Sequence, residues 1–231
     1  MRLLLVGHGR MGKLVEALAP EYDATVAGVV TTRDAEAALR EGDFGPVDVA
    51  IDFTLADAVP RNLPLLASRG VNVVIGTTGW AAHEAELRAI VDRTNIGLLA
   101  AANFSLGLNL FQIVVEEAAR RVAGHDSFGA WIHELHHAAK KDAPSGTALQ
   151  LKSGMQGAGY ARPIDVSSAR VGSIPGTHLV GFDGPADTIT LTQTVRDRAV
   201  FARGALEAAR WLKGRRGWFT MRDMLTGKEQ T

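Results

Sequence analysis

The residues most suited to chemistry in this chain lie in one stretch, Glu134 to Leu149, which reads ELHHAAKKDAPSGTAL. It contains two adjacent histidines, His136 and His137, and two adjacent lysines, Lys140 and Lys141. A histidine can carry a proton near neutral pH, since its reference pKa is about 6.5. A lysine ammonium adds a compact positive charge with three donors. The stretch therefore combines groups that can protonate a bound molecule with groups that can hold a negative charge.

The same stretch contains Pro144-Ser-Gly-Thr147, which has the composition of a helix start. Proline is tolerated in a first helical turn, and a serine or an aspartate caps it. The free amides of Ser145, Gly146 and Thr147, together with the positive end of the helix, would then form an anion site. We expect a small dicarboxylate to find a lysine ammonium, imidazole donors and helix-start amides here.

Strand periodicity places His136 and His137 on opposite faces of one strand, because successive side chains alternate; Glu134 falls on the face of His136. The two imidazoles therefore need not share a role. A solvated lysine loop and half-buried structural histidines are the ordinary alternatives. No metal site is predicted, since no further carboxylate or histidine lies at ligand spacing and a protonated lysine is a poor ligand.

A second motif lies where the apolar run Leu3 to Val6 meets Gly7-His-Gly-Arg-Met-Gly12, just before a helical pattern. The pattern G-x-G-x-x-G in this context is typical of dinucleotide binding, because its glycines let the backbone approach a pyrophosphate and let helix and strand pack closely. The helix start offers N–H groups to the phosphates. An ordinary tight turn is the alternative. A P-loop is not expected, because Lys13 is followed by Leu14 and not by a hydroxyl residue.

The choice of cofactor depends on the end of the second predicted strand, which reads Val29-Val-Thr-Thr-Arg-Asp34. The acidic residue that usually binds the adenosine ribose about 20 positions after the glycines is missing. Thr31 or Thr32 could bind the ribose, and Arg33 could pair with a 2′-phosphate. The sequence thus leans toward NADPH over NADH, with a solvated loop arginine as the alternative.

Apolar runs that alternate with helical patterns predict an α/β fold, with an N-terminal Rossmann-like, doubly wound parallel sheet. The predicted strands span residues 25–30, 47–53, 71–75 and 96–100, and the clearest helix between them spans 82–91. Glycine-bearing turns at 76–79 and 101–105 follow two of these strands. Ligands bind at the carboxyl ends of such strands, so both turns are candidate cofactor contacts, and plain turns are the alternative.

The pattern changes beyond Asn103, where a helix over 108–122 precedes strands that alternate in polarity. In the strand 188–195 the threonines fall on one face and the apolar residues on the other, so the threonine face is either solvated or used in oligomer contact. We expect residues 1–104 with 200–231 to form the dinucleotide-binding domain. Residues 105–199 are expected to form a smaller α+β domain for substrate binding and oligomerisation, with an open, mostly antiparallel sheet. A final helix over 199–212 returns to the first domain, and Gly154 to Gly159 is predicted to be a loop.

The composition limits the possible partners. Lys plus Arg and Asp plus Glu number 25 each, so no overall field favours nucleic acid or an anionic membrane. The chain has no cysteine, which excludes thiol catalysis and fits a reducing interior. Its first apolar run is too short for a signal peptide or a membrane span. We therefore expect a soluble, cytoplasmic protein.

The stretch that begins at Glu134 resembles the signature of the 4-hydroxy-tetrahydrodipicolinate reductase (dihydrodipicolinate reductase) family, E-x-H-H-x-x-K-x-D-A-P-S-G-T-A. The resemblance extends over nearly the whole chain, including Asp48 to Thr54, Phe201 to Ala205 and Met221 to Leu225. It implies an oxidoreductase that reduces a cyclic imine dicarboxylate with NADH or NADPH, on the route to diaminopimelate and lysine. It also implies a homotetramer formed through the sheets of the second domain.

The resemblance assigns roles residue by residue. It implies that His136 donates a proton, that His137 contacts the substrate and that Lys140, rather than Lys141, is the signature lysine. Carboxylate contacts fall on Gly146 and Thr147, in agreement with the helix start read from the residues, to which Ser145 also belongs. Cofactor contacts fall on three turns: Gly7, His8, Gly9, Arg10, Met11 and Gly12; Gly76, Thr77 and Thr78; Ala101, Ala102, Asn103 and Phe104.

The chain departs from the family pattern at four positions, Thr31, Val171, Thr177 and Gln193, and it is shorter between the second strand and Asp48. These departures bear on cofactor choice and on the surroundings of the site. Two rival functions are a related amino-acid or imine dehydrogenase and a cofactor-sensing binding protein without catalysis. Oxidation of NAD(P)H on addition of the imine substrate would discriminate between them.

Overall fold

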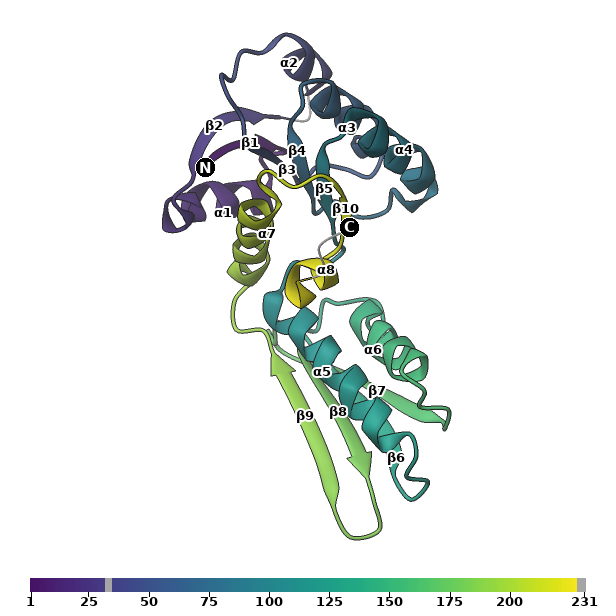
Figure 1. Cartoon of the computed structure of the whole chain (residues 1–231). Helices are drawn as coiled ribbons and strands as arrows, with labels where there is room; N and C mark the ends of the chain where they lie inside the picture. Colours follow the sequence, from purple (N-terminus) through teal and green to yellow (C-terminus); the bar gives the residue numbers. More distant parts are fainter. Residues whose placement is uncertain (32–34, 228–231) are drawn as a thin grey trace. The chain divides into compact units, whose positions relative to one another are not determined.

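The computed structural model describes residues 1–31 and 35–227, and the chain folds into two compact units (Figure 1). The first unit comprises Met1–Leu106 with Ala199–Thr231, and the second comprises Gly107–Arg198. The boundaries between the two units thus lie after residues 106 and 198. The boundaries expected from the sequence lie after residues 104 and 199. None of the helices formed by the described residues is long and apolar enough to cross a lipid bilayer.

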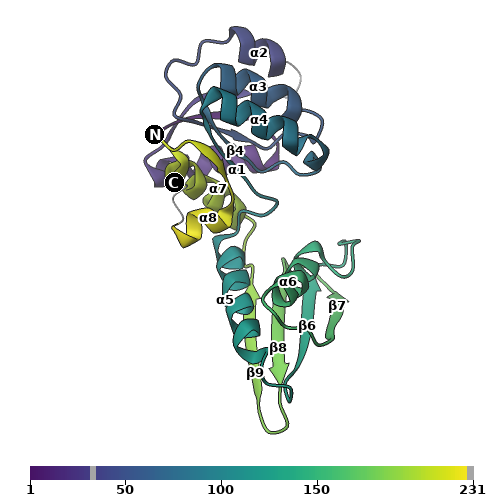
Figure 2. The same cartoon turned by 45° about the vertical axis from the view of Figure 1, so that its right-hand side comes forward.

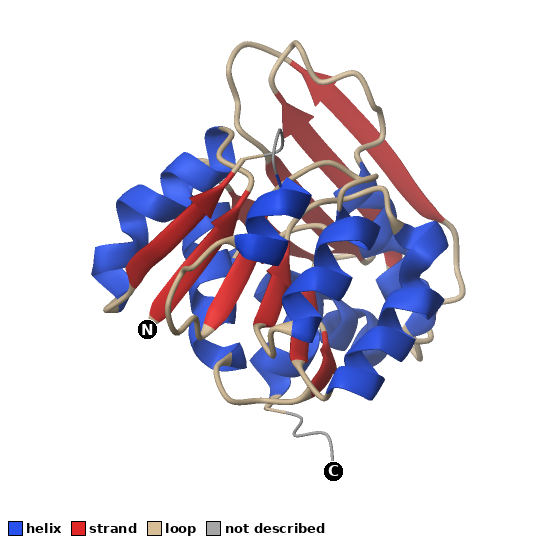
Figure 3. Cartoon of the chain, turned by 90° about the horizontal axis from the view of Figure 1, so that it is seen from above, coloured by secondary structure: helices blue, strands red, loops and turns tan. Residues whose placement is uncertain are grey.

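The first unit contains six parallel strands in the order β10-β5-β4-β3-β1-β2, which confirms the Rossmann-like sheet. Strands β1, β3 and β4 are almost completely buried, because helices cover both faces of the sheet (Figure 3). The strands are β1 (Arg2–Val6), β2 (Thr25–Val30), β3 (Val49–Asp52), β4 (Asn72–Ile75), β5 (Gly97–Ala100) and β10 (Gly217–Phe219).

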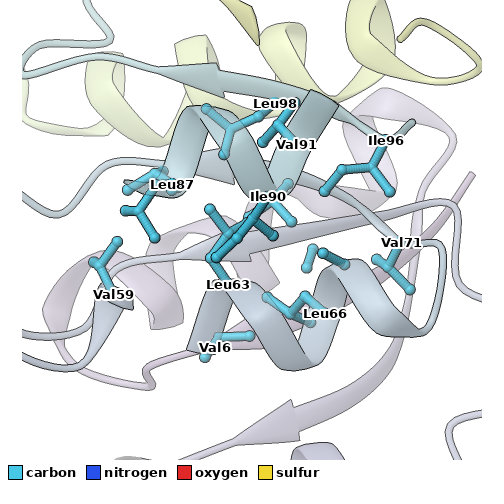
Figure 4. Packing of buried hydrophobic residues seen from close by; sticks show 14 of the residues in the cluster. Val6, Val59, Leu63, Leu66, Val71, Leu87, Ile90, Val91, Ile96 and Leu98 are labelled. Atoms are coloured by element: carbon cyan, nitrogen blue, oxygen red, sulfur yellow. The ribbon is translucent and has the colours of Figure 1, made fainter. Parts of the chain in front are cut away.

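Alternate residues of each strand face different helices. Leu4 and Val6 pack with α2, α3 and α4, whereas Leu3 and Leu5 pack with α1 and α7. Figure 4 shows the first of these clusters, in which Leu63 and Leu66 of α3 lie beside Leu87 and Ile90 of α4. The elements are α1 (Arg10–Leu18), η1 (Ala19–Tyr22), α2 (Ala35–Glu41), α3 (Val59–Ser68), η2 (Ala81–His83), α4 (Glu84–Thr94), α7 (Ala199–Leu212) and α8 (Met221–Thr226).

The second unit has a four-stranded sheet in the order β7-β6-β8-β9, in which β6 and β7 are parallel and the other pairs antiparallel. Helices α5 and α6 lie on one face of this sheet and complete its core (Figure 2). Trp131, Leu179 and Thr192 belong to the opposite face. The elements are α5 (Leu106–Val122), β6 (Gly129–His136), α6 (Gly146–Gly157), β7 (Ile164–Arg170), β8 (Thr177–Asp183) and β9 (Thr188–Thr194).

Three local predictions were wrong. Residues 154–157, expected in a loop, form the last turn of α6, where a Cβ on Gly154 would lie 2.8 Å from Glu116 Oε1. The glycine leaves room for the Glu116 side chain of α5, and packing of Leu151 and Met155 in the core outweighs the low helix propensity of glycine. Strand β6 ends at His136, so His137 lies in the following loop. Pro144 precedes the N-cap Ser145 and is therefore outside the first turn of α6.

Gly204 of α7 packs against the backbone after β5, and this contact predicts a large effect of one methyl group. A Cβ on Gly204 would lie 1.7 Å from the carbonyl oxygen of Phe104. We expect Gly204→Ala to lower the free energy of unfolding by about 1 to 3 kcal/mol, measured by urea denaturation, because the packed backbone must shift. Gly157→Ala is the control, since nothing lies within 4 Å of its added Cβ. Equal stability of the two variants would contradict this account.

Candidate active site

The turn after β1 has the geometry that a pyrophosphate requires. Gly7 has φ +90°, and its N–H donates to the Val30 carbonyl at 2.8 Å. A Cβ on Gly7 would lie 2.4 Å from the Phe53 carbonyl oxygen, and one on Gly12 would lie 2.2 Å from that of Gly7. A Cβ on Gly9 instead would have nothing within 4 Å, and no described side chain caps α1. The backbone at this helix start is therefore open to a phosphate.

Two pockets in the first unit bring the expected cofactor turns together. One, of about 420 Å³, joins the turn at Gly9, Arg10 and Met11 to the turn at 76–78. The other, of about 270 Å³, joins Thr77 and Thr78 to Ala101 and Ala102. Both pockets lie at the carboxyl ends of the strands, as expected for a nicotinamide dinucleotide. The arrangement of these residues fits such a cofactor.

Asp52, at the end of β3, is a buried carboxylate that the sequence analysis did not assign to the site. It accepts hydrogen bonds from the Thr54 amide (2.9 Å) and hydroxyl (2.6 Å), from Asn62 Nδ2 (3.1 Å) and from the Thr77 hydroxyl (3.0 Å). Burial raises the pKa of Asp52, and these donors oppose that shift. Asp52 therefore fixes the turns after β3 and β4. An acidic residue at the end of an apolar strand was the signal that could have identified it.

The remaining cofactor candidates lie in different environments. His8 Nε2 is 2.7 Å from Glu16 Oε2, and Asn103 Oδ1 accepts from the Ser105 amide at 2.8 Å. The Phe104 side chain is buried and packs edge-on against Phe53, so a contact from Phe104 to a cofactor would come from its backbone. Thr31 is exposed directly after β2, whereas the Arg33 prediction lies outside the described residues.

In the second unit, alternation along β6 buries Glu134 and His136 on the helix-covered side of the sheet. Glu134 Oε1 accepts from Arg170 Nη2 at 2.7 Å and from the Ser145 amide at 3.2 Å. Glu134 Oε2 accepts from Arg170 Nη1 at 3.0 Å and faces His136 Nδ1 at hydrogen-bonding distance. Burial raises the pKa of Glu134, but hydrogen bonds from Arg170, Ser168 and His136 outweigh it and bring the pKa to about 2.

His178 of β8 is a second buried imidazole in this cluster. Its ring lies edge-on to that of His136, with centroids 5.2 Å apart, and its Nε2 is 3.4 Å from the Ser145 hydroxyl. Burial, followed by the nearby His136, lowers the pKa of His178 to about 4. His178 is therefore neutral at physiological pH. Neither His178 nor Arg170 was predicted at the site from the sequence, because strand pairing brings them there from distant positions.

The start of α6 has the predicted cap. The Ser145 hydroxyl accepts from the Ala148 amide at 3.2 Å, Gly146 is exposed and Thr147 is half-buried. Lys140 lies in the preceding loop, where its Nζ is 2.8 Å from Asp142 Oδ1. The hydrogen bond from Lys140 lowers the pKa of Asp142. Asp142 also accepts from the Gly146 amide, so its carboxylate brings Lys140 and the start of α6 together.

His137 has different surroundings from those of His136, because it lies in the loop after β6. It lines a pocket of about 670 Å³ together with Arg196 and Arg198, which the sequence analysis did not select. Arg198 Nη2 is 3.4 Å from His137 Nε2. Guanidinium groups bind carboxylates well, so this pocket suits an anionic group.

One cluster of potential metal ligands does occur among the described residues. Ligand atoms of Glu134, His136 and His178 lie within 4.8 Å of one another, although the sequence spacing suggested no such group. The Arg170 guanidinium, however, occupies both oxygens of Glu134 and places a positive charge beside them. This engagement makes the carboxylate a poor metal ligand, so the cluster is better suited to proton chemistry than to metal binding.

Two family models together match almost the whole chain. The model described as "Dihydrodipicolinate reductase, N-terminus" matches residues 1–104, and "Dihydrodipicolinate reductase, C-terminus" matches residues 107–225. The 4-hydroxy-tetrahydrodipicolinate reductase of Stenotrophomonas maltophilia is 41% identical over 97% of this chain and 98% of the relative. That of Christiangramia forsetii is 33% identical over 98% of both chains.

Solved structures share the fold. A dipicolinate-bound dihydrodipicolinate reductase from Paenisporosarcina sp. TG-14 aligns with a TM-score of 0.80 at 20% identity, over 95% of this chain and 97% of that chain. GenD2 from gentamicin A biosynthesis, in complex with NAD, aligns with a TM-score of 0.59 at 14% identity, over 100% and 88% of the two chains. At these identities the likeness concerns the fold alone.

The buried His178 predicts acid sensitivity in a defined pH range. Its pKa is about 4 in the folded protein and about 6.5 in the unfolded chain, so the unfolded chain takes up the proton first as the pH falls. We expect a loss of up to about 3 kcal/mol in the free energy of unfolding between pH 6.5 and pH 4. Urea denaturation across this range measures the slope.

The variant His178→Gln should remove this part of the slope, whereas His125→Gln, at an exposed histidine, should keep it. Identical pH slopes for the wild-type protein and His178→Gln would show that the buried imidazole does not cause the acid sensitivity.

Proposed function

Because the chain belongs to the dihydrodipicolinate reductase family, it is an NAD(P)H-dependent oxidoreductase that reduces 4-hydroxy-tetrahydrodipicolinate in diaminopimelate and lysine biosynthesis, and we propose that His136 and Lys140 provide its acid chemistry. One observation carries this assignment. The side chain of His136 and the backbone amide of Ser145 contact the same carboxylate, so the proton carrier and the helix start lie within reach of one small molecule.

A nicotinamide dinucleotide held by the turns that line the two pockets of the first unit would supply a hydride to a conjugated ring carbon of the substrate, once the substrate hydroxyl has left as water. Electron density then moves toward the ring nitrogen. His136 delivers the proton that this change requires, and the Lys140 ammonium stabilises the negative charge that develops. A positioned acid of this kind contributes roughly 100- to 10,000-fold in rate.

The two substrate carboxylates need separate partners. We assign one to the amides of Gly146 and Thr147 with the Ser145 hydroxyl, since the positive end of a helix binds anions. We assign the other to the pocket at His137, where Arg198 adds a guanidinium. Dipicolinate, the dicarboxylate bound to the Paenisporosarcina reductase, has the charge that this arrangement would bind.

For the cofactor, the preference for NADPH over NADH is a proposal based on the exposed Thr31 and on Arg33 in the sequence after β2. A 2′-phosphate would pair with an arginine at this place, where the usual ribose-binding acid is missing. The missing cysteines fit a reaction in the reducing cytoplasm.

We also propose a homotetramer that forms through the face of the β7-β6-β8-β9 sheet opposite to α5 and α6. This face carries the half-buried side chains of Trp131 and Leu179. Together they give the open face of the sheet two large apolar side chains. The exposed threonines of β9 lie beside them, with Thr192 paired to Leu179. Flat, β-branched surface of this kind packs well against a second copy.

The variant Lys140→Ala tests the chemistry. We expect a loss of at least about 100-fold in kcat for oxidation of NADPH or NADH with the imine substrate, because the developing charge loses its cation. Lys141→Ala is the matched control, since Lys141 is the adjacent, exposed lysine and should keep nearly full activity. Equal rates for the two variants would refute the role of Lys140, and an inactive wild-type protein would refute the proposed reaction.

The variant Leu179→Arg tests the oligomer. A charge in the middle of a packed sheet face should reduce the particle mass, measured by light scattering after gel filtration, because the guanidinium would lose its hydration at the interface. Leu149→Arg, on an exposed position of α6, should leave the mass unchanged. A wild-type monomer, or an unchanged mass for Leu179→Arg, would exclude this interface.

A further inference from the structure

One buried carboxylate connects the two parts of the candidate site in the second unit. Glu134 has 0% exposed surface, and each of its oxygens has at least two partners. Oε1 binds Arg170 and the backbone amide of Ser145, and Oε2 binds Arg170 and His136 Nδ1. A single side chain thus contacts the histidine that we assign as proton donor and the helix start that we assign to a substrate carboxylate.

We propose that Glu134 is a positioning residue that orients His136, so that Nε2 carries the proton for the substrate, and that it anchors the start of α6 at the same time. This inference rests on the proposed function, because it concerns how His136 performs the role given there. Glu134 itself is too deeply buried to contact the substrate and acts through its neighbours.

The hydrogen-bonding chemistry fixes the tautomer of His136. An ionised carboxylate only accepts hydrogen bonds, so Nδ1 must carry a hydrogen whether the imidazole is neutral or charged. The exchangeable proton therefore sits on Nε2. Space exists at this nitrogen because position 176 is a glycine: a Cβ there would lie 3.1 Å from His136 Nε2.

Arg170 keeps Glu134 ionised at this depth. A buried carboxylate without a partner would take up a proton, whereas the two-pronged contact with the guanidinium stabilises its charge. Arg170 also donates to the carbonyl oxygens of Ala169 and Asp142, so it links β7 to the loop that carries Lys140. The ion pair therefore places the acid, the lysine loop and the helix start relative to one another.

The titratable and charged groups around His136 come from three strands and one loop: Glu134 of β6, Arg170 of β7, the neutral His178 of β8 and Lys140 of the loop after β6. Burial lowers the pKa of His136, and the two cations lower it further, while Glu134 opposes both effects. Loss of the Glu134 charge should therefore lower this pKa further, and the imidazole would hold its proton less well at neutral pH.

The wild-type protein already provides a test by ¹⁵N NMR of its histidines. His136 should show the tautomer with hydrogen on Nδ1 above its pKa, because Glu134 accepts from that nitrogen. Hydrogen on Nε2 in the neutral state would overturn the proposal, whatever the activity of the enzyme.

The variant Glu134→Gln keeps the size of the side chain and removes its charge. We expect kcat to fall at least about tenfold, with the alkaline limb of the kcat–pH profile moved to lower pH, because the histidine loses its orientation and its counter-charge. Binding of the dicarboxylate dipicolinate should weaken too, since the helix start loses its anchor. Glu117→Gln, on the exposed face of α5, is the control and should change none of these.

If Glu134→Gln leaves Arg170 unpaired and does not fold, the double variant Glu134→Gln/Arg170→Met removes both charges and serves for the same measurements. A purely structural role predicts that this double variant recovers kcat and its pH profile together with stability, and that result would overturn the proposal. If the wild-type protein does not reduce the imine, the proposed function fails, while the NMR tautomer still decides the positioning role.

Discussion

The ion pair between Glu134 and Arg170 is the constraint on which the second unit depends. Removing two charges from water costs several kcal/mol per ion unless geometry and further hydrogen bonds compensate. Here every oxygen of the carboxylate has two partners, from β6, β7 and the start of α6. If one of these three elements moved independently, a charge would be exposed to water or left buried without a partner. The hydrogen bonds that offset the desolvation cost of the ion pair therefore also hold the site rigid.

The first unit also contains a buried carboxylate that hydrogen bonds satisfy, but there the donors are neutral. Asp52 is buried at the end of β3 and is satisfied by two hydroxyls, an amide nitrogen of the backbone and the side chain of Asn62. These bonds hold the turns that line the larger of the two pockets described in the first unit. Both units thus place one buried carboxylate beneath a turn of a candidate site, and neither carboxylate is itself exposed.

Local patterns predicted the elements that are specified locally. Strand β2 and helix α7 have the predicted ends, because apolar runs and helical periodicity depend on neighbouring residues alone. The cap at Ser145 follows from its residue type. By contrast, Arg170 and His178 reach the site through strand pairing, and Asp52 through contacts between turns, which no spacing in the sequence encodes. The last turn of α6, which contains Gly154, depends on the packing of Leu151 and Met155 in the core of the second unit.

The parallel pairing of β6 and β7 has a consequence for how this site can vary. Parallel neighbours need a crossover, and α6 provides it, so the helix start must follow the carboxyl end of β6, just as α1 follows β1 in the first unit. The residues between His136 and Ser145 are therefore a replaceable connection on a fixed frame. Evolution or design could alter the shape of the accepted acid by rebuilding this connection, while the frame that orients the proton is left intact.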